Sequence, residues 1–137
     1  MHLSNTSQYA IRILNYLANH NDAKLYSAKE LSETLDISYK FLTKIMTDLV
    51  KANFILSIRG RDGGFKLARK SSSITVMEIL NTFNQFQAHD ECLLGIGKCD
   101  GNNKCSLHDQ WREPKDMIEY MFENTTLENL EGSNFKI

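Results

Sequence analysis

Residues 27–67 read SAKELSETLDISYKFLTKIMTDLVKANFILSIRGRDGGFKL, and this stretch decides the fold because its pattern passes from helical to extended. Ser27 and Glu30 have the spacing of a capping box, which predicts that a short helix begins there. After a tight turn, Ser38 is the expected N-cap of a longer helix. Helical spacing gives that helix an inner face of apolar residues: Phe41, Leu42, Ile45, Leu49 and Val50.

A β-hairpin is predicted directly after the second helix. Residues 54–58 and 65–68 are rich in the residue types that favour strands. Between them, the glycines of RGRDGG at residues 59–64 supply the positive φ angles that a tight hairpin tip requires. Helix, turn, helix and glycine-tipped hairpin, in that order, predict a winged helix-turn-helix.

Helices are also predicted on both sides of this module. Apolar residues at helical spacing indicate one over residues 7–19, and a capping box at residues 75–78 opens another. A polar loop follows at residues 85–105, and then a long helix, which we expect Pro114 to kink or break. A last capping box at residues 125–128 predicts a terminal helix. The expected fold class is therefore mainly α with a small β-hairpin.

The composition places the chain among globular proteins of one domain's length. It has 137 residues, of which 42% are hydrophobic. No run of about 18 apolar residues is present, and the first residues lack the pattern of a signal peptide. We therefore expect a cytoplasmic protein with no membrane partner. In a reducing compartment, three cysteines favour metal binding or redox sensing over a disulfide framework.

The small net charge of -1 conceals a division along the chain. Residues 1–74 carry 11 basic and 6 acidic side chains, whereas residues 75–137 carry 5 and 11. Within residues 38–70 the imbalance is 8 basic to 2 acidic, which suits a polyanionic partner. We divide the chain into a winged helix-turn-helix region at 1–74 and a second region at 75–137. The second region holds the cysteine loop, at about 85–108, and the C-terminal helices.

The basic module carries side chains suited to double-stranded DNA. The second helix of a helix-turn-helix enters the major groove, and a narrow hairpin with arginines can enter the minor groove. Hydroxyl groups bond bases or phosphates, and lysines neutralise phosphates. Each position taken alone is equally well explained as solvated surface. The predicted DNA-binding residues are Ser38, Tyr39, Lys40, Thr43 and Lys44 on the helix, and Arg59, Gly60 and Arg61 on the wing.

The three cysteines lie within fourteen positions, and a histidine follows the last of them. Thiolates favour zinc or iron-sulfur clusters, and imidazole can complete such a site. Structural zinc sites usually contain close Cys-x2-Cys pairs, whereas the gaps here are six and five residues. Iron-sulfur ligation is therefore favoured, with zinc and free redox-active cysteines as the alternatives. The predicted ligands are Cys92, Cys99, Cys105 and His108.

Several motifs extend along nearly the whole chain: LS-x4-YA at 3–10, IS-x3-L at 37–42, SIRGRDGGF-x-L at 57–67, I-x-V at 74–76 and the cysteine run. Together they resemble the IscR/NsrR family of bacterial regulators. The resemblance implies a winged-helix homodimer, with the long C-terminal helix as the dimerisation element. It also implies an iron-sulfur cluster held in the loop before that helix.

The resemblance implies two alternative clusters. In IscR-like members a two-iron cluster is held by three cysteines and a histidine, which match Cys92, Cys99, Cys105 and His108. In NsrR-like members a four-iron cluster takes an aspartate from the partner's first helix, where this chain has Gln8. A 2Fe-2S cluster is therefore favoured and a 4Fe-4S cluster is the alternative. The chain departs from IscR in a longer first cysteine gap and in having Thr43 and Lys44 where IscR has Glu and Gln.

The predicted function is that of a DNA-binding transcription regulator with a near-palindromic operator and with repression as the expected outcome. A cluster that senses redox state, nitric oxide or iron status would control its DNA binding. One alternative is a winged-helix regulator that senses thiol oxidation or binds zinc. Another is a small electron-transfer or cluster-delivery protein that binds no DNA. The sequence contains no Gly-x-Ser-x-Gly or His-Glu-x-x-His motif and no phosphate-binding Gly-rich loop, so we expect no enzyme.

Overall fold

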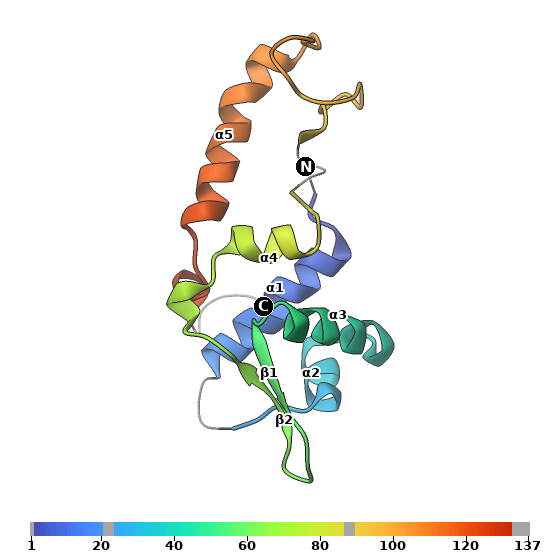
Figure 1. Cartoon of the computed structure of the whole chain (residues 1–137), viewed down its shortest axis with the longest axis vertical. Coiled ribbons are helices and arrows are strands. Elements are labelled where there is room, and N and C mark those ends of the chain that lie inside the picture. The colour runs from blue at the N-terminus through green and yellow to red at the C-terminus, as the bar shows by residue number, and fades with distance from the viewer. Residues whose placement is uncertain (1, 21–23, 87–89, 133–137) are drawn as a thin grey trace.

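The structure is a computed structural model that describes residues 2–20, 24–86 and 90–132. Its helices and strands, in chain order, are α1 (Asn5–Asn19), α2 (Ala28–Leu35), α3 (Tyr39–Lys51), β1 (Ile55–Ile58), β2 (Gly64–Leu67), η1 (Ser71–Ser73), α4 (Val76–Thr82), α5 (His108–Asn124) and η3 (Glu128–Leu130). This confirms the predicted fold class, mainly α with one hairpin. Figure 1 shows a body made of α1–α4 and the hairpin, from which α5 projects as an arm with the cysteine loop at its far end.

The helix starts follow the predicted capping signals. The Ser27 Oγ accepts a hydrogen bond of 3.1 Å from the Glu30 N–H, and the Glu30 carboxylate accepts one of 2.9 Å from the Ser27 N–H. Thr75 and Glu78 form the same reciprocal pair at α4, with distances of 3.2 and 3.0 Å. Ser38 caps α3 through the Phe41 N–H. Each cap supplies a partner for amides that the first helical turn leaves unpaired.

The wing is an antiparallel pair in which Ile55 lies opposite Leu67 and Ile58 opposite Gly64. The outer edge of β2 is covered, because Tyr26 and Phe65 exchange backbone hydrogen bonds of 3.1 and 2.8 Å. At Gly64 a Cβ atom would lie 2.8 Å from the Tyr26 carbonyl oxygen, so this close approach requires glycine.

The core joins all parts of the body and extends past residue 74. Its fully buried members include Ile13, Leu14, Leu31, Leu42, Ile45, Leu49, Ile55, Ile74, Ile79 and Leu127. Leu127 reaches this core because the chain returns to the body after α5. There the Leu127 N–H donates to the Ile74 carbonyl at 3.0 Å, and Thr75 and Thr126 form an antiparallel bridge. The hydrophobic core therefore contains residues from both sides of residue 74. The functional division at that residue stays a prediction.

Two local predictions are wrong, and a third is wrong in part. Phe41 is 36% exposed and meets the edge of Tyr9 with ring centroids 5.5 Å apart, because it lies at the margin of the apolar face of α3. Of the kink or break predicted at Pro114, the break is absent, since α5 runs unbroken through the proline, and the kink stays a prediction. The residue whose carbonyl the proline leaves unpaired, Gln110, is exposed, so water can satisfy that group.

The terminal helix predicted at residues 125–128 is instead the short 3-10 turn η3. Its N-cap position is Leu127, and the bonds near its start join Thr126, not Thr125, to Asn129, at 2.8 and 3.4 Å. Thr125 is occupied elsewhere, because its hydroxyl donates to the Met121 carbonyl at 2.6 Å at the end of α5. Within the described residues, no helix has the length and apolar character needed to cross a lipid bilayer.

Candidate functional site

The predicted reading face lies on the outer side of α3. Ser38, Tyr39, Lys40 and Lys44 are exposed, and Thr43 is half-buried. The Thr43 hydroxyl donates to the Lys40 carbonyl at 3.0 Å, and that of Thr47 donates to the Thr43 carbonyl at 3.0 Å. Because these hydroxyl protons are used within the helix, the oxygens remain free to accept hydrogen bonds from a ligand.

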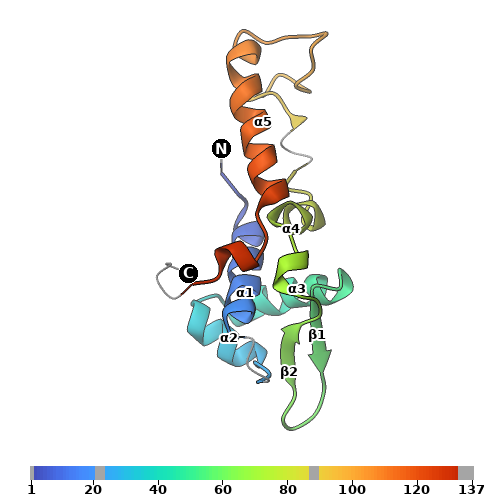
Figure 2. The same ribbon diagram turned by 90° about the vertical axis from the view of Figure 1, so that its left-hand side faces the viewer.

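The predicted wing residues form the hairpin tip. Arg59, Gly60 and Arg61 are all exposed, and the Gly63 N–H closes the turn by donating to the Gly60 carbonyl at 3.1 Å. Gly60 has a φ of 126°, which a residue with a side chain rarely adopts. Asp62 is exposed at the same tip. Figure 2 shows that this tip and the end of the arm lie at opposite ends of the molecule.

A groove of about 620 Å³ separates the reading face from the wing. Tyr39, Thr43 and Arg59 of the predicted set line it. Lys51 and Ser57 also line it, although neither belongs to the predicted DNA-binding residues. The available signal was their spacing, since Lys51 is one helical turn beyond Thr47 and Ser57 lies two residues before Arg59.

The cysteine loop begins with a tight turn around Cys92. The Cys92 N–H donates to the Gly97 carbonyl at 2.7 Å, and the Gly95 N–H donates to the Cys92 carbonyl at 2.8 Å. Backbone N–H groups of Ile96 and Leu94, followed by the Cys105 thiol and the Gly95 N–H, hold the pKa of Cys92 below its usual value. Several amide donors around one buried sulfur favour its thiolate form, which is the form that binds metal.

The four predicted ligands lie near one another, since Cys105 interacts with Cys92 and Cys99, and Cys99 contacts His108. The Cys105 thiol donates a hydrogen bond to Cys92, and this raises the pKa of Cys105. The Leu107 N–H partly opposes the effect. The Sγ of Cys99 lies 3.6 Å from Nδ1 of His108, the buried first residue of α5. Within residues 2–20, 24–86 and 90–132, no three His, Cys, Asp or Glu side chains are close enough to hold one metal ion.

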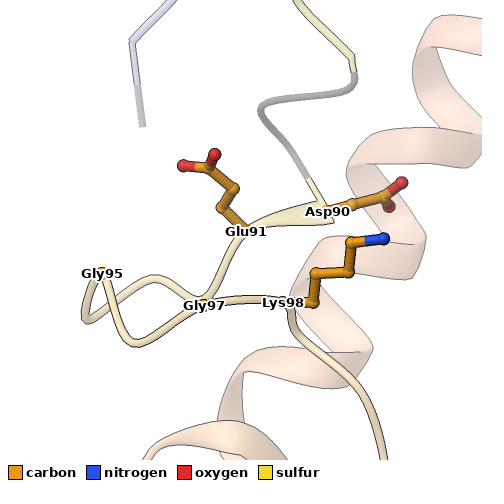
Figure 3. Close-up of a pocket in the computed structure, with 5 residues that line it drawn as sticks. All are labelled: Asp90, Glu91, Gly95, Gly97 and Lys98. Carbon is orange, nitrogen blue, oxygen red and sulfur yellow. The ribbon is translucent and has the colours of Figure 1, made fainter.

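An ion pair fixes the loop against α5. The Nζ of Lys115 lies 3.6 Å from Asp90, and the Lys115 side chain is only 13% exposed. Figure 3 shows Asp90 directed towards the helix, while Glu91 points away from it on the other side of the turn. This turn borders a hollow of about 500 Å³ lined by Asp90, Glu91, Gly95, Gly97 and Lys98. Nearer the helix start, Lys104 bonds Asp109 at 2.9 Å and lowers the pKa of that carboxyl.

The arm also carries an exposed apolar face. Met117, Tyr120 and Met121 of α5 are 65%, 68% and 51% exposed. Large apolar side chains exposed together on one helix are typical of surfaces that bind another protein.

The family model of Rrf2, described as an iron-dependent transcriptional regulator, matches residues 3–132. A putative HTH-type transcriptional regulator of Aquifex aeolicus is 35% identical over 132 residues, which are 95% of this chain and 91% of the relative. The HTH-type transcriptional regulator IscR of Escherichia coli is 30% identical over 130 residues, 95% of this chain and 80% of IscR.

Two solved structures have the same fold. CymR, described as the global cysteine regulator of B. subtilis, superimposes with a TM-score of 0.80 at 24% identity, covering 95% of both chains. The IscR of T. potens superimposes with a TM-score of 0.73 at 23% identity, covering 100% of this chain and 93% of the other.

Proposed function

Because the chain belongs to the Rrf2 family of transcriptional regulators, we propose that it is a cytoplasmic, DNA-binding homodimer whose affinity for its operator depends on a 2Fe-2S cluster. One observation carries the proposal. The tip of the basic wing and the cysteine loop lie at opposite ends of the molecule, and the arm that bears the loop is anchored at its base in the core of the body through Leu127. A change at the loop therefore has a physical route to the reading surface.

Double-stranded DNA is the partner that the reading surface fits best. The proposed contacts are Ser38, Tyr39, Lys40, Thr43, Lys44, Arg59, Gly60 and Arg61. The face of α3 would enter the major groove and the wing the adjacent minor groove. A second copy would cover the apolar face of α5, and two-fold symmetry then predicts a near-palindromic operator.

The cluster would be held by Cys92, Cys99, Cys105 and His108. Among the described residues no three potential ligands surround one point, as a zinc ion would require, whereas a two-iron cluster takes two protein side chains at each iron. The amide donors around Cys92 support a thiolate there, and the description of the family as iron-dependent supports iron over zinc. When bound, the cluster supplies a cross-link that oxidants, nitric oxide or iron shortage can break.

The chain's own contacts would couple the loop to the body. The Lys115–Asp90 ion pair holds the loop on α5, and the Cys99–His108 contact joins it to the first residue of that helix. At the base, the Val76 N–H donates to the Thr125 carbonyl at 2.8 Å, which connects the end of α5 to α4. A loop held in one conformation thus stabilises one position of the arm. In a dimer, that position would set the distance between the two winged helix-turn-helix modules. Repression is the outcome we propose.

A second candidate is a winged-helix regulator that senses thiol oxidation. The observation in its favour is the hydrogen bond between Cys105 and Cys92, which brings two thiols of unequal pKa together. A peroxide could oxidise the Cys92 thiolate, and attack by Cys105 would then form a disulfide with release of water. A zinc-dependent regulator is the remaining variant of this candidate.

Purification without oxygen tests the proposal, with a visible spectrum, an iron and sulfide assay, and selection of bound duplexes from a random pool. We expect a coloured protein with about two irons and two sulfides per protomer, and tighter or different DNA binding when iron is present. Cys92→Ser should lose the colour, whereas Ser106→Ala, a small change at an exposed loop position, should keep it. A colourless zinc protein, or a metal-free protein that peroxide switches reversibly, would support the second candidate instead.

A further inference from the structure

The groove between α3 and the wing has a lining that combines apolar and cationic side chains. Its floor is apolar and contains Met46, which is 1% exposed, together with the half-buried Phe65. Its rims carry the cations Lys51 and Arg59 and the hydroxyl of Ser57. Among the described residues that line it, none is acidic. A lining of this kind matches a ligand that alternates anionic groups with apolar surfaces.

The position of the groove is as specific as its chemistry. Tyr39 and Thr43 belong to the face proposed for the major groove, and Arg59 to the wing proposed for the adjacent minor groove. In duplex DNA, a single sugar-phosphate strand separates a major groove from the neighbouring minor groove. If both elements read the same duplex, that strand has to pass through the space between them.

We propose, on the basis of the proposed function, that this groove seats one DNA backbone strand, with Lys51 and Ser57 as phosphate contacts and the apolar floor against the deoxyribose. The Lys51 ammonium neutralises a phosphate, and the Ser57 hydroxyl donates to a phosphate oxygen. These contacts set register and affinity without reading the bases.

A purely structural role for Lys51 would have a different effect on stability and DNA binding from that of a phosphate contact. Lys51 is the last residue of α3, where a cation stabilises the helix end by its interaction with the helix dipole. That role would lower the stability of Lys51→Ala without changing how its DNA binding depends on salt. The salt dependence therefore separates a phosphate contact from a helix-end effect.

The test uses the duplex that the wild-type protein selects from a random pool, with protein purified without oxygen. Lys51→Ala should weaken binding about tenfold and lower the slope of log affinity against log salt by about 0.9 per protomer. The loss should be the same for optimal and mismatched duplexes. Lys70→Ala removes the same charge from an exposed position that does not line the groove, and it should leave the slope unchanged.

A single uncharged methylphosphonate, placed at each phosphate in turn, identifies the contact. At one position per half-site it should weaken the wild-type complex and have little further effect on Lys51→Ala. An unchanged salt slope for Lys51→Ala, or full methylphosphonate losses in that variant at every position, would overturn the inference. If the wild-type protein selects no duplex at all, the proposed function fails instead.

Discussion

The Sγ of Cys99 lies 3.6 Å from Nδ1 of His108, across the junction between the cysteine loop and the first residue of α5. His108 is buried, so this contact fixes the orientation of the imidazole at the base of the loop. Any ligand held by this pair is therefore attached to the arm itself and not only to a polar loop.

Replacing His108 with Ala should remove most of the bound iron, because one of four proposed ligands is lost. His108→Cys should retain iron and lower the reduction potential, since a thiolate adds negative charge where the imidazole had none. Iron assays and redox titration of the visible absorption measure both effects. His20→Ala, which changes a histidine at the end of α1 instead, is the control and should keep the iron content of the wild type.

Removing the carboxylate at the wing tip should strengthen DNA binding. Asp62 is exposed beside Arg61, where its negative charge would repel nearby phosphates. Asp62→Asn should raise affinity several-fold in a titration at low salt, and the gain should shrink as salt increases. Asp116→Asn makes the same charge change on the exposed surface of α5 and should have little effect. Equal gains in both variants would mean that only net charge matters.

Gln85 should stabilise the start of α1. Its side-chain oxygen accepts a hydrogen bond of 2.7 Å from the Ser4 N–H and one of 3.4 Å from the hydroxyl of the fully buried Ser7. Gln85→Ala leaves these donors without that acceptor and should lower the free energy of unfolding by about 1 kcal/mol. Urea unfolding measures the change. Gln110→Ala, at an exposed position of α5, should change it by much less.

The capping box at Ser27 should make stability depend on pH. The Ser27 N–H, and after it Lys24, holds the pKa of Glu30 below its ordinary value of 4.5. A depressed carboxyl pKa stabilises the folded state above the ordinary value, and this contribution is lost as the pH falls through the lower, folded-state pKa. The stability difference between the wild type and Glu30→Gln should therefore be constant near neutral pH and shrink below pH 4.5. A difference that does not change with pH would contradict this.

Leu127 should matter more than its place near the chain end suggests. Its side chain is 0% exposed in the core of the body. Leu127→Ala should lower the free energy of unfolding by about 2–5 kcal/mol, as for other buried leucines. Leu130→Ala, at a partly buried position, should lower it by less. Thermal or urea unfolding of both variants gives the comparison. Equal, small losses would mean that the returning segment contributes little to the core.

Local signals explain what the sequence could predict. The capping residues Ser27 and Thr75 act within one helical turn, and the tip glycines act within one hairpin, so their effects are visible in short stretches. Phe41 was misassigned because helical spacing defines a face but not its margin. Thr125 was wrongly predicted as a helix cap. Its hydroxyl donates to Met121 of α5 and its carbonyl accepts from Val76 of α4, and neither residue belongs to the capping pattern.

In the candidate site, too, local features could be predicted and contacts between distant residues could not. Spacing alone was enough to select the cysteines as candidate ligands and the outward residues of α3 as candidate DNA contacts. The Lys115–Asp90 ion pair and the groove at Lys51 join residues far apart in the chain or on different elements, and they exist only once the elements have packed. The pairing of Cys92 with Cys105 and of Cys99 with His108 likewise depends on how the loop folds.

The bridge between Thr75 and Thr126 brings two distant points of the chain together, so that α4 and the arm form one excursion between them. The entropy of closing such an excursion grows slowly, by about 0.6 kcal/mol for each doubling of its length. The body can therefore tolerate arms of different length and chemistry. The chemistry of the cysteine loop could thus change in the course of evolution while the winged helix-turn-helix kept its fold.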